Sequence, residues 1–436
     1  MSSSGPAAMT LLLRAYRRLG PIATGAADGL PAAERRRAMV TLSIAMGTAV
    51  LASVIANIAL PAIAAELAVT PAQAVWVVNA YTLTMTVLML PFASLGDIYG
   101  YRPVYLFGVA VFTLSSLACG LAESLPVLVT ARILEGVGAA GVASVNMALV
   151  RHIYPPEKLG GGMGVIGLVV AAAAAGGPSL AAAILEVASW HYLFLLNVPL
   201  GVLALHLALR SLPATPGAGH RFDFAGAALN AVGFGLMFIG ADGLGHRGGV
   251  GWSVAELAAG LGIFVGFVRR QLSVAAPMLP VDLMRLPPFV MSVATSVCSY
   301  VCQTLLFLSL PFYFFYAGGQ SQIETGLLMT PFPAALVVVA PLAGRLSDRY
   351  PAGLLCGIGL AMLTAGVLLL MRVPPEAHWP EVTWRMLLCS VGFGLFQSPN
   401  NRAFMASAPR ERSGACAGMM TTSRLTGRQS AVSSWR

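Results

Sequence analysis

Charged residues are scarce in this sequence, and their scarcity excludes an ordinary soluble protein. Asp, Glu, Lys and Arg make up 10% of the 436 residues, while 57% are hydrophobic. Soluble domains carry about 25% charged residues, so this chain is too apolar to present a normal water-exposed surface. The composition predicts a chain that is surrounded by lipid over most of its length.

Cysteine and recognisable catalytic motifs are equally limited. The six cysteines form no cluster with the spacing of metal ligands. The sequence contains neither a phosphate-binding P-loop nor the pattern of a catalytic triad. The first apolar run is too short for a cleavable signal peptide. We therefore expect no enzymatic activity, no bound metal and no cofactor.

Long apolar runs are what the sequence has in abundance. About 20 consecutive apolar residues cross a bilayer as a helix, and runs of this kind recur along the whole chain. They predict an all-α polytopic membrane protein. The twelve predicted spans lie near residues 39–63, 75–96, 103–122, 126–149, 163–186, 190–210, 222–241, 255–272, 288–316, 325–346, 353–371 and 382–400.

Positive charge is distributed unevenly among the predicted loops. The net charge is +9, and 22 of the 26 Lys and Arg residues fall in the terminal regions and alternate loops, against three in the intervening loops. Loops rich in Lys and Arg stay in the cytoplasm by the positive-inside rule. The pattern predicts a multi-pass protein of the cell membrane with a cytoplasmic N-terminus. It argues against binding of nucleic acid, because the charge is explained by topology.

Two short charged turns interrupt the apolar runs at corresponding places. Residues 95–102 read Leu-Gly-Asp-Ile-Tyr-Gly-Tyr-Arg and follow the second predicted span, and residues 344–349 read Gly-Arg-Leu-Ser-Asp-Arg and follow the tenth. At both places an acid stands four residues after a small residue, Asp97 after Ala93 and Asp348 after Gly344. Weak internal repeats of this kind are typical of transporters whose halves are related by symmetry.

Several motifs, taken in order, resemble the major facilitator superfamily, and within it the fourteen-helix drug:proton antiporters of the EmrB/QacA type. The resemblance covers roughly residues 39–427. It includes an Asn-Ile-Ala-Leu-Pro run, the first charged turn, an Arg-x-x-Glu-Gly stretch, a Gly-Gly-Pro motif and a Gln-Ser-Pro-Asn-Asn run. The matching segments are residues 57–61, 76–81, 93–102, 132–140, 176–178, 189–201 and 397–401.

The resemblance implies the major facilitator fold, with two helical bundles and a two-helix insert between them. A thirteenth span begins near residue 414 and turns polar after residue 427, so we expect a chain that is truncated within that helix. The expected parts are a cytoplasmic tail, a six-helix bundle, the insert with its connector, a second bundle with four spans, and an incomplete helix with a polar tail. Their boundaries are 1–38, 39–212, 213–287, 288–406 and 407–436.

The two charged turns supply the candidates for a conformational latch. The resemblance implies that Asp97 accepts hydrogen bonds from a neighbouring helix end and, with Arg102, locks one of two alternating-access states. The alternative is a solvated loop acid beside an arginine that only sets the topology. The latch candidates are Asp97, Gly100, Arg102, Asp348 and Arg349.

Arg132 and Glu135 are the clearest pair of opposite charges within a predicted span. Their spacing of three residues places both on one helix face, and ionisable groups at this depth are costly unless they are paired or hydrated. The resemblance implies that Arg132 tunes a proton-carrying acid. Glu135 is then either the protonation site or only the counter-ion of Arg132.

Two further groups complete the candidate residues. Gly176, Gly177 and Pro178 resemble the antiporter motif and would form a rocking or proton-sealing helix, with ordinary tight packing as the alternative. Polar residues that lie within their spans are candidates for the substrate cavity. These are Asn57, Asn79, Tyr81, Tyr300 and Gln303.

These features together predict proton-driven efflux of amphipathic, cationic compounds by alternating access, with the proton motive force as energy source. The expected partners are the small-molecule substrate, protons, the lipid bilayer and, in a Gram-negative source, a periplasmic adaptor. A truncated, transport-inactive membrane protein is one alternative function. A carrier for a specific metabolite is another, and the direction of transport stays open.

Overall fold

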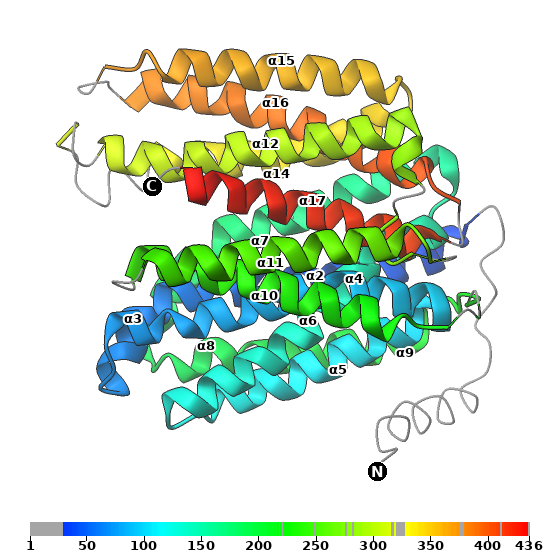
Figure 1. Cartoon of the computed structure of the whole chain (residues 1–436). Helices are drawn as coiled ribbons and strands as arrows, with labels where there is room; N and C mark the ends of the chain where they lie inside the picture. The colour runs from blue at the N-terminus through cyan, green and yellow to red at the C-terminus, as the bar shows by residue number, and fades with distance from the viewer. Residues whose placement is uncertain are drawn as a thin grey trace, which may run out of the picture.

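The protein consists of long helices that run side by side in two groups (Figure 1). The computed structural model describes residues 29–217, 219, 221–246, 250–274, 277–280, 283–314, 318–319, 328–374, 379–409 and 412–434. Over these ranges the chain contains helices and turns and no strand. The prediction of an all-α polytopic protein is therefore confirmed.

The first bundle occupies the lower half of Figure 1 and is made of the early helices. Its first helix begins at Ala32, so residues 35–37, which the sequence placed in the tail, form the first turns of the helix. The predicted sixth span is interrupted at Leu196. The elements are α2 Ala32–Glu66, α3 Pro71–Ala74, α4 Trp76–Tyr99, α5 Tyr101–Gly120, α6 Leu125–Ile153, η1 Pro156–Lys158, α7 Leu159–Val187, α8 His191–Leu195 and α9 Asn197–Ser211.

The second bundle occupies the upper half of Figure 1. The sequence predicted an incomplete helix and a polar tail after residue 407, but the last helix continues to Ser434. Its final turns are polar, and an unbroken helix still satisfies their backbone groups better than an irregular tail would. The elements are η2 Leu283–Arg285, α12 Pro287–Phe312, α14 Pro331–Ser347, α15 Ala352–Leu370, α16 Trp379–Ala406 and α17 Ser413–Ser434.

The predicted insert forms two helices, α10 Phe224–His246 and α11 Val250–Gln271. Asn230 of α10 donates a hydrogen bond of 2.7 Å to the carbonyl of Val87 in α4, which ties the insert to the first bundle. At the start of α10, Asp223 accepts hydrogen bonds from Gly226 N–H and from Arg270. Burial raises the pKa of Asp223, but the hydrogen bonds from Arg270 and Gly226 outweigh it, and the pKa lies below its usual value.

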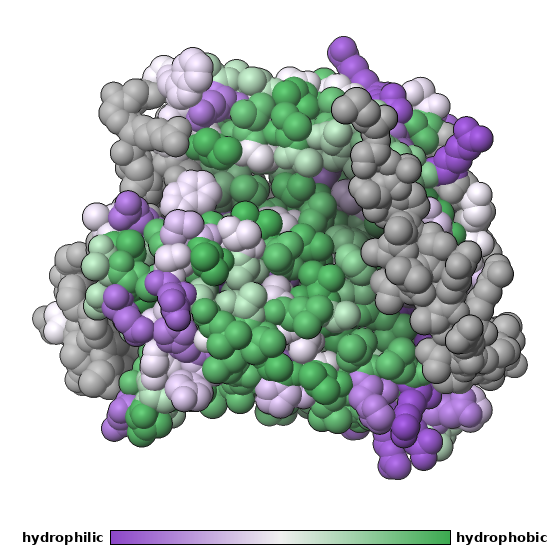
Figure 2. Space-filling view, turned by 90° about the horizontal axis from the view of Figure 1, so that it is seen from below, coloured by the Kyte–Doolittle hydropathy of each residue, from purple (hydrophilic) through white to green (hydrophobic). Residues whose placement is uncertain are grey.

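Over their described residues, the twelve predicted spans fall on helices, and the sixth falls on two, but the helices differ in how well they fit a bilayer. Within the described residues, nine helical segments are long and apolar enough to cross a membrane. The apolar parts of α10 and α14 are shorter, at Phe224–Gly240 and Pro331–Ser347. Figure 2 shows the corresponding surface, on which apolar residues form a broad band and polar residues gather toward the two ends.

One end of the molecule carries most of the positive charge and is called the basic end below. It lies on the right in Figure 1, where α2 and α5 begin and α6 and α14 end. Arg35, Arg102, Arg151 and Arg345 lie in these helix ends. The helices α2, α7, α12 and α17 begin there, and α4, α6, α14 and α16 end there. The clustering agrees with the uneven loop charge in the sequence.

Glycine sets the spacing of α5 and α6, which pack against each other along their length. A Cβ atom on Gly108 would lie 2.7 Å from the backbone nitrogen of Val142, and one on Gly141 would lie 2.9 Å from Cα of Gly108. A Cβ atom on Gly138 would overlap the backbone nitrogen of Phe112. The two backbones are therefore in contact, as small residues allow between membrane helices.

Replacing Gly138 by Ala is expected to destabilise the protein by about 1–3 kcal/mol, because the added methyl group forces the two helices apart. Thermal unfolding of the purified variant in detergent measures the effect. The matched control is Gly235→Ala in α10, where a Cβ atom meets nothing within 4 Å. There the better helix propensity of Ala should leave stability unchanged or raise it. Equal effects of the two substitutions would contradict a close contact of the α5 and α6 backbones at Gly138.

Candidate functional site

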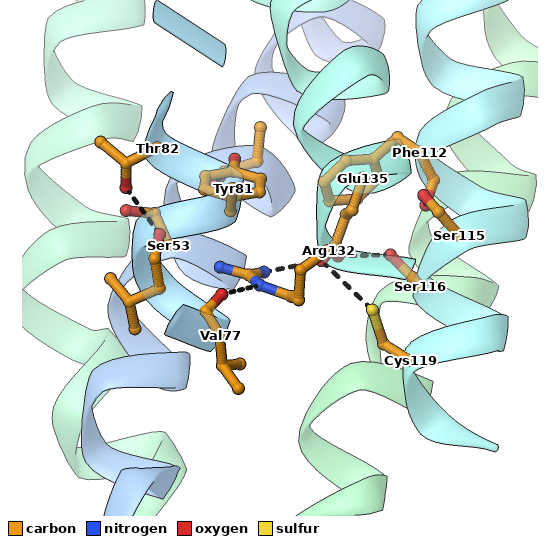
Figure 3. Close-up of polar contacts among 12 residues, drawn as sticks. Ser53, Val77, Tyr81, Thr82, Phe112, Ser115, Ser116, Cys119, Arg132 and Glu135 are labelled. Carbon is orange, nitrogen blue, oxygen red and sulfur yellow. Dashed lines mark hydrogen bonds and ion pairs between the residues drawn. The ribbon is translucent and has the colours of Figure 1, made fainter. Parts of the chain in front are cut away.

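Arg132 and Glu135 form a closed ion pair inside the first bundle (Figure 3). Arg132 Nη1 lies 2.6 Å from Glu135 Oε2, and both side chains are fully buried. Arg132 Nε also donates a hydrogen bond of 2.8 Å to the carbonyl of Val77 in α4. The spacing of three residues on α6 makes the ion pair possible. The carbonyl of Val77 in α4 orients the guanidinium of Arg132.

Aromatic rings surround the guanidinium of Arg132. Its Cζ atom lies 4.2 Å from the ring centroid of Tyr81 and 5.7 Å from that of Phe194. A cation over a ring face is attracted by the ring quadrupole, most strongly when it is desolvated. Arg132 Nη2 is buried without a hydrogen-bond partner among the described residues, so the rings add to the stabilisation that Glu135 and Val77 give the guanidinium.

The carboxylate of Glu135 points toward α5. Ser116 donates a hydrogen bond of 2.7 Å to Oε1, and the thiol of Cys119 lies 3.7 Å from Oε2. Oε1 therefore has a donor from α5, and Oε2 has a donor from α5 in addition to the guanidinium. Sequence reasoning missed Ser116 and Cys119, because their contact with Glu135 depends on how α5 and α6 pack.

Asp97 joins the end of α4 to the start of α17, across the two bundles. Its Oδ1 and Oδ2 accept backbone hydrogen bonds of 2.8 Å from Gly414 and 2.9 Å from Ala415. Tyr101 donates a further hydrogen bond of 2.6 Å to Oδ1. A carboxylate at a helix N-terminus satisfies free N–H groups and interacts favourably with the helix dipole. The geometry is that of a helix cap supplied by the opposite bundle.

Gly100 and Arg102 shape the turn that presents Asp97. Gly100 has φ +91°, and a Cβ atom there would lie 2.5 Å from the carbonyl oxygen of Thr215, so only glycine fits. Arg102 turns into its own bundle, where Nη2 donates a hydrogen bond of 2.7 Å to the carbonyl of Leu209. The two charges of the turn therefore contact different helices.

Asp348 repeats the arrangement at the end of α14. Its Oδ1 and Oδ2 accept backbone hydrogen bonds of 2.8 Å from Gly160 and 2.9 Å from Gly161, at the start of α7. The arginine that faces this carboxylate is Arg402, with Nε 3.8 Å from Oδ1. Arg349 is exposed, so the structure brings Arg402 rather than Arg349 to the site. Sequence reasoning missed Arg402, because it lies on α16.

Further contacts hold the two bundles together at the same end. Arg151, at the end of α6, donates hydrogen bonds to the carbonyls of Ala408 and Pro409 and to the hydroxyl of Ser413. Close helix crossings accompany them. A Cβ atom on Gly164 of α7 would lie 3.2 Å from Cα of Gly344 in α14.

The crossing of α4 and α17 uses glycine on one side only. A Cβ atom on Gly418 of α17 would lie 2.9 Å from Cβ of Ala93 in α4. The methyl group of Ala93 fits in α4 because Gly418, which faces it from α17, has no side chain. The basic end is thus closed by polar contacts and tight backbone packing.

The three residues that resemble the antiporter motif lie in different surroundings along α7. Gly177 packs tightly, because a Cβ atom there would lie 2.9 Å from Cγ1 of Val54 in α2. A Cβ atom on Gly176 would meet nothing within 4 Å. Pro178 lies inside the helix. Tight packing therefore explains Gly177 and leaves Gly176 without a packing reason.

The five cavity candidates do not form one group. Tyr81 lies under Arg132 and donates its hydroxyl hydrogen to the carbonyl of Ala49. Asn57 is exposed and bonds to Ser53 of its own helix. Asn79 and Gln303 are half-buried on α4 and α12.

Tyr300 belongs to a polar cluster in the second bundle that sequence reasoning missed. Its hydroxyl accepts a hydrogen bond of 2.6 Å from Gln397, and Arg424 lies 5.6 Å from its ring centroid. Arg424 also donates a hydrogen bond of 2.5 Å to Asn401. The sequence placed Arg424 with the loop charges, but it lies 11 residues into α17, about 16 Å along the helix. A positive charge therefore lies within the second bundle.

The family model described as Major Facilitator Superfamily matches residues 42–428. The chain belongs to the major facilitator superfamily. A relative in Escherichia coli K12, described as the uncharacterized transporter YebQ, is 48% identical over 93% of this chain and 89% of its own length. The multidrug resistance protein Stp of Mycobacterium tuberculosis CDC 1551 is 34% identical over 86% of this chain and 71% of its own.

Solved structures of the superfamily share the fold. The crystal structure of the human organic anion transporter MFSD10 superposes with a TM-score of 0.63 at 15% identity, and the match covers 93% of each chain. Identity this low supports the fold alone. The chain is a membrane transporter, and transporters of this superfamily bind small-molecule substrates.

Asp97→Asn is expected to loosen the start of α17, because one negative charge and its dipole interaction are lost at the helix N-terminus. Cys416 reports on this region, since it is fully buried two residues after Gly414. Labelling by N-ethylmaleimide, mapped by peptide mass spectrometry, should be faster at Cys416 in this variant. Asp223→Asn, whose carboxylate pairs with Arg270 in the insert, is the matched control. An unchanged labelling rate at Cys416 would contradict a capping role for Asp97.

Proposed function

We propose that this protein exports amphipathic small molecules by alternating access, and that proton binding at Glu135 drives the cycle. The observation that carries the proposal is the burial of the Arg132–Glu135 pair. Glu135 is ten residues from the start of α6, about 15 Å along the helix, and it is fully buried. A carboxylate at this depth is a functional site by default in a membrane protein.

The contacts of Glu135 support a proton-binding role. When Glu135 is ionised, Arg132 neutralises it and Ser116 donates to it. When Glu135 binds a proton, the pair loses one charge and Arg132 is left to Val77 and the aromatic rings. The two protonation states therefore favour different packing of α4, α5 and α6, which is the coupling that a proton-driven transporter requires.

The closed basic end supports alternating access. The caps at Asp97 and Asp348 and the hydrogen bonds of Arg151 join opposite bundles, and all of them lie at one end. By the positive-inside rule this end faces the cytoplasm, so the structure would be the outward-facing state of a cell-membrane protein. The fourteen-helix antiporter branch and a periplasmic adaptor stay predictions.

Charge in the second bundle bears on the substrate. Glu135 is paired with Arg132, whereas Arg424 is bonded to the neutral side chain of Asn401. This arrangement does not favour a fixed cation, so the proposal covers amphipathic compounds without requiring positive charge. The cluster of Tyr300, Gln397, Asn401 and Arg424 also favours a second candidate, a carrier for one polar metabolite. The similarity to the multidrug resistance protein Stp supports the first candidate, export of amphipathic compounds.

Glu135→Gln is expected to abolish substrate transport driven by a pH gradient, because the side chain can no longer bind and release a proton. Substrate exchange in proteoliposomes without a gradient should persist, since exchange needs no net proton movement. A panel of cationic, uncharged and anionic fluorescent dyes serves as substrate. Glu123→Gln, in an exposed turn before α6, is the control and should transport as the native protein does.

The variant also tests the counter-ion alternative. Removing one partner of a buried ion pair costs about 3–5 kcal/mol, because the other charge is left unpaired. If Glu135 is only a counter-ion, the double variant Arg132→Gln/Glu135→Gln should regain both stability and gradient-driven transport. If Glu135 carries the proton, the double variant should regain stability alone. Full gradient-driven transport by Glu135→Gln would contradict the proposal.

A further inference from the structure

A groove of about 450 Å³ lies at the basic end, between the start of α2 and a wall formed by Tyr154, which follows α6, and Val165 of α7. One face of α2 forms its floor, because the lining residues recur every three or four positions. This face consists of Ala32, Arg35, Arg36, Met39, Val40, Ser43 and Ile44. The groove is distant from Glu135 and belongs to neither latch contact.

Two arginines line the outer end of the groove. Arg35 lies 5.4 Å from the ring centroid of Tyr154, and Arg36 is exposed. Within the described part of the chain, no carboxylate lies within ion-pair distance of either guanidinium. Guanidinium groups bind phosphate oxygens in a bidentate manner more readily than other side chains do. The outer end therefore fits an anion with phosphate geometry.

The inner part of the groove is apolar. Met39, Val40 and Ile44 follow the arginines along α2, and Val40 has 47% of its surface exposed. From Arg36 to Ile44 the helix rises by about 12 Å. The groove thus has positive charge at the membrane surface and an apolar face deeper in the membrane. A free phosphate ion would use only the outer end.

We propose that this groove binds one anionic phospholipid, with its phosphate between Arg35 and Arg36 and part of one acyl chain along Met39, Val40 and Ile44. Basic pockets between membrane helices bind anionic lipid head groups in this way. The occupant is a lipid rather than a soluble anion, because the apolar length matches an acyl chain. Tyr154 and Val165 close the side of the groove, so the lipid lies against α7.

Native mass spectrometry of the purified full chain in detergent tests the proposal with two probes, dioleoylphosphatidylglycerol and dioleoylphosphatidylcholine. The native protein should retain one molecule of the anionic lipid under conditions that remove the zwitterionic one. Arg35→Ala/Arg36→Ala should weaken binding of the anionic lipid about tenfold or more. Arg35→Lys/Arg36→Lys keeps the charge and should retain most of the preference.

Matched variants separate this site from general surface charge. Arg210→Ala/Arg269→Ala removes two exposed arginines from the same end and should leave lipid binding unchanged. Val40→Trp fills the apolar channel and should weaken binding while both arginines remain. Equal retention of the two lipids, or equal loss in the two double-alanine variants, would overturn the proposal. Displacement of the anionic lipid by millimolar inorganic phosphate would identify a soluble-anion site and would also overturn it.

Discussion

The structure depends on two carboxylates, each of which caps a helix start in the opposite bundle. Asp97 binds the start of α17, and Asp348 binds the start of α7, each through two backbone N–H groups. Free N–H groups and the helix dipole make a helix N-terminus a ready anion site. Each cap therefore links the end of a helix in one bundle to the start of a helix in the other. The hydrogen bonds of a cap break if the helix start moves by a few ångströms, so the contact can be reversible.

Apolar packing follows the same division between the two ends. One buried cluster continues from the first bundle into Phe289 of α12, Phe404 of α16 and Met420 of α17. In contrast, the cluster that contains Trp190 and Phe194 at the other end consists of first-bundle residues. The bundles therefore share a large core near the basic end, and the cluster of the second bundle takes in Ala171 of α7, whereas the cluster around Trp190 belongs to the first bundle. Opening that end would separate the shared cluster and break both caps. It would also expose apolar side chains of the cluster, which costs free energy.

Much of this arrangement could be predicted from the sequence. Apolar runs located the helices, and the acids in the two charged turns marked Asp97 and Asp348. The spacing of Arg132 and Glu135 indicated an ion pair, because residues three apart share a helix face. These features are local, so neighbouring residues in the chain are sufficient to reveal them.

Features that depend on contacts between distant helices could not be predicted. Arg402 faces Asp348 in place of Arg349, and the bonds of Arg151 to the loop before α17 carry no sequence signal. Tyr81 was a cavity candidate, yet its ring contacts Arg132. Arg424 was counted with the loop charges, because polar residues near it obscured the helix. Apart from that of Arg424, these differences arise from packing between helices, which neighbouring residues in the chain do not reveal.

The central claim is that Asp97 and Asp348 hold the basic end closed. The most direct test is a distance between the bundles, measured by double electron–electron resonance. Spin labels at Glu157→Cys and Gly353→Cys, two exposed positions in opposite bundles at this end, are introduced after the six native cysteines are replaced. If the two caps hold this end closed, the native protein should give one short distance, and Asp97→Asn/Asp348→Asn should add a second, longer population. An unchanged distance distribution in that double variant would contradict it.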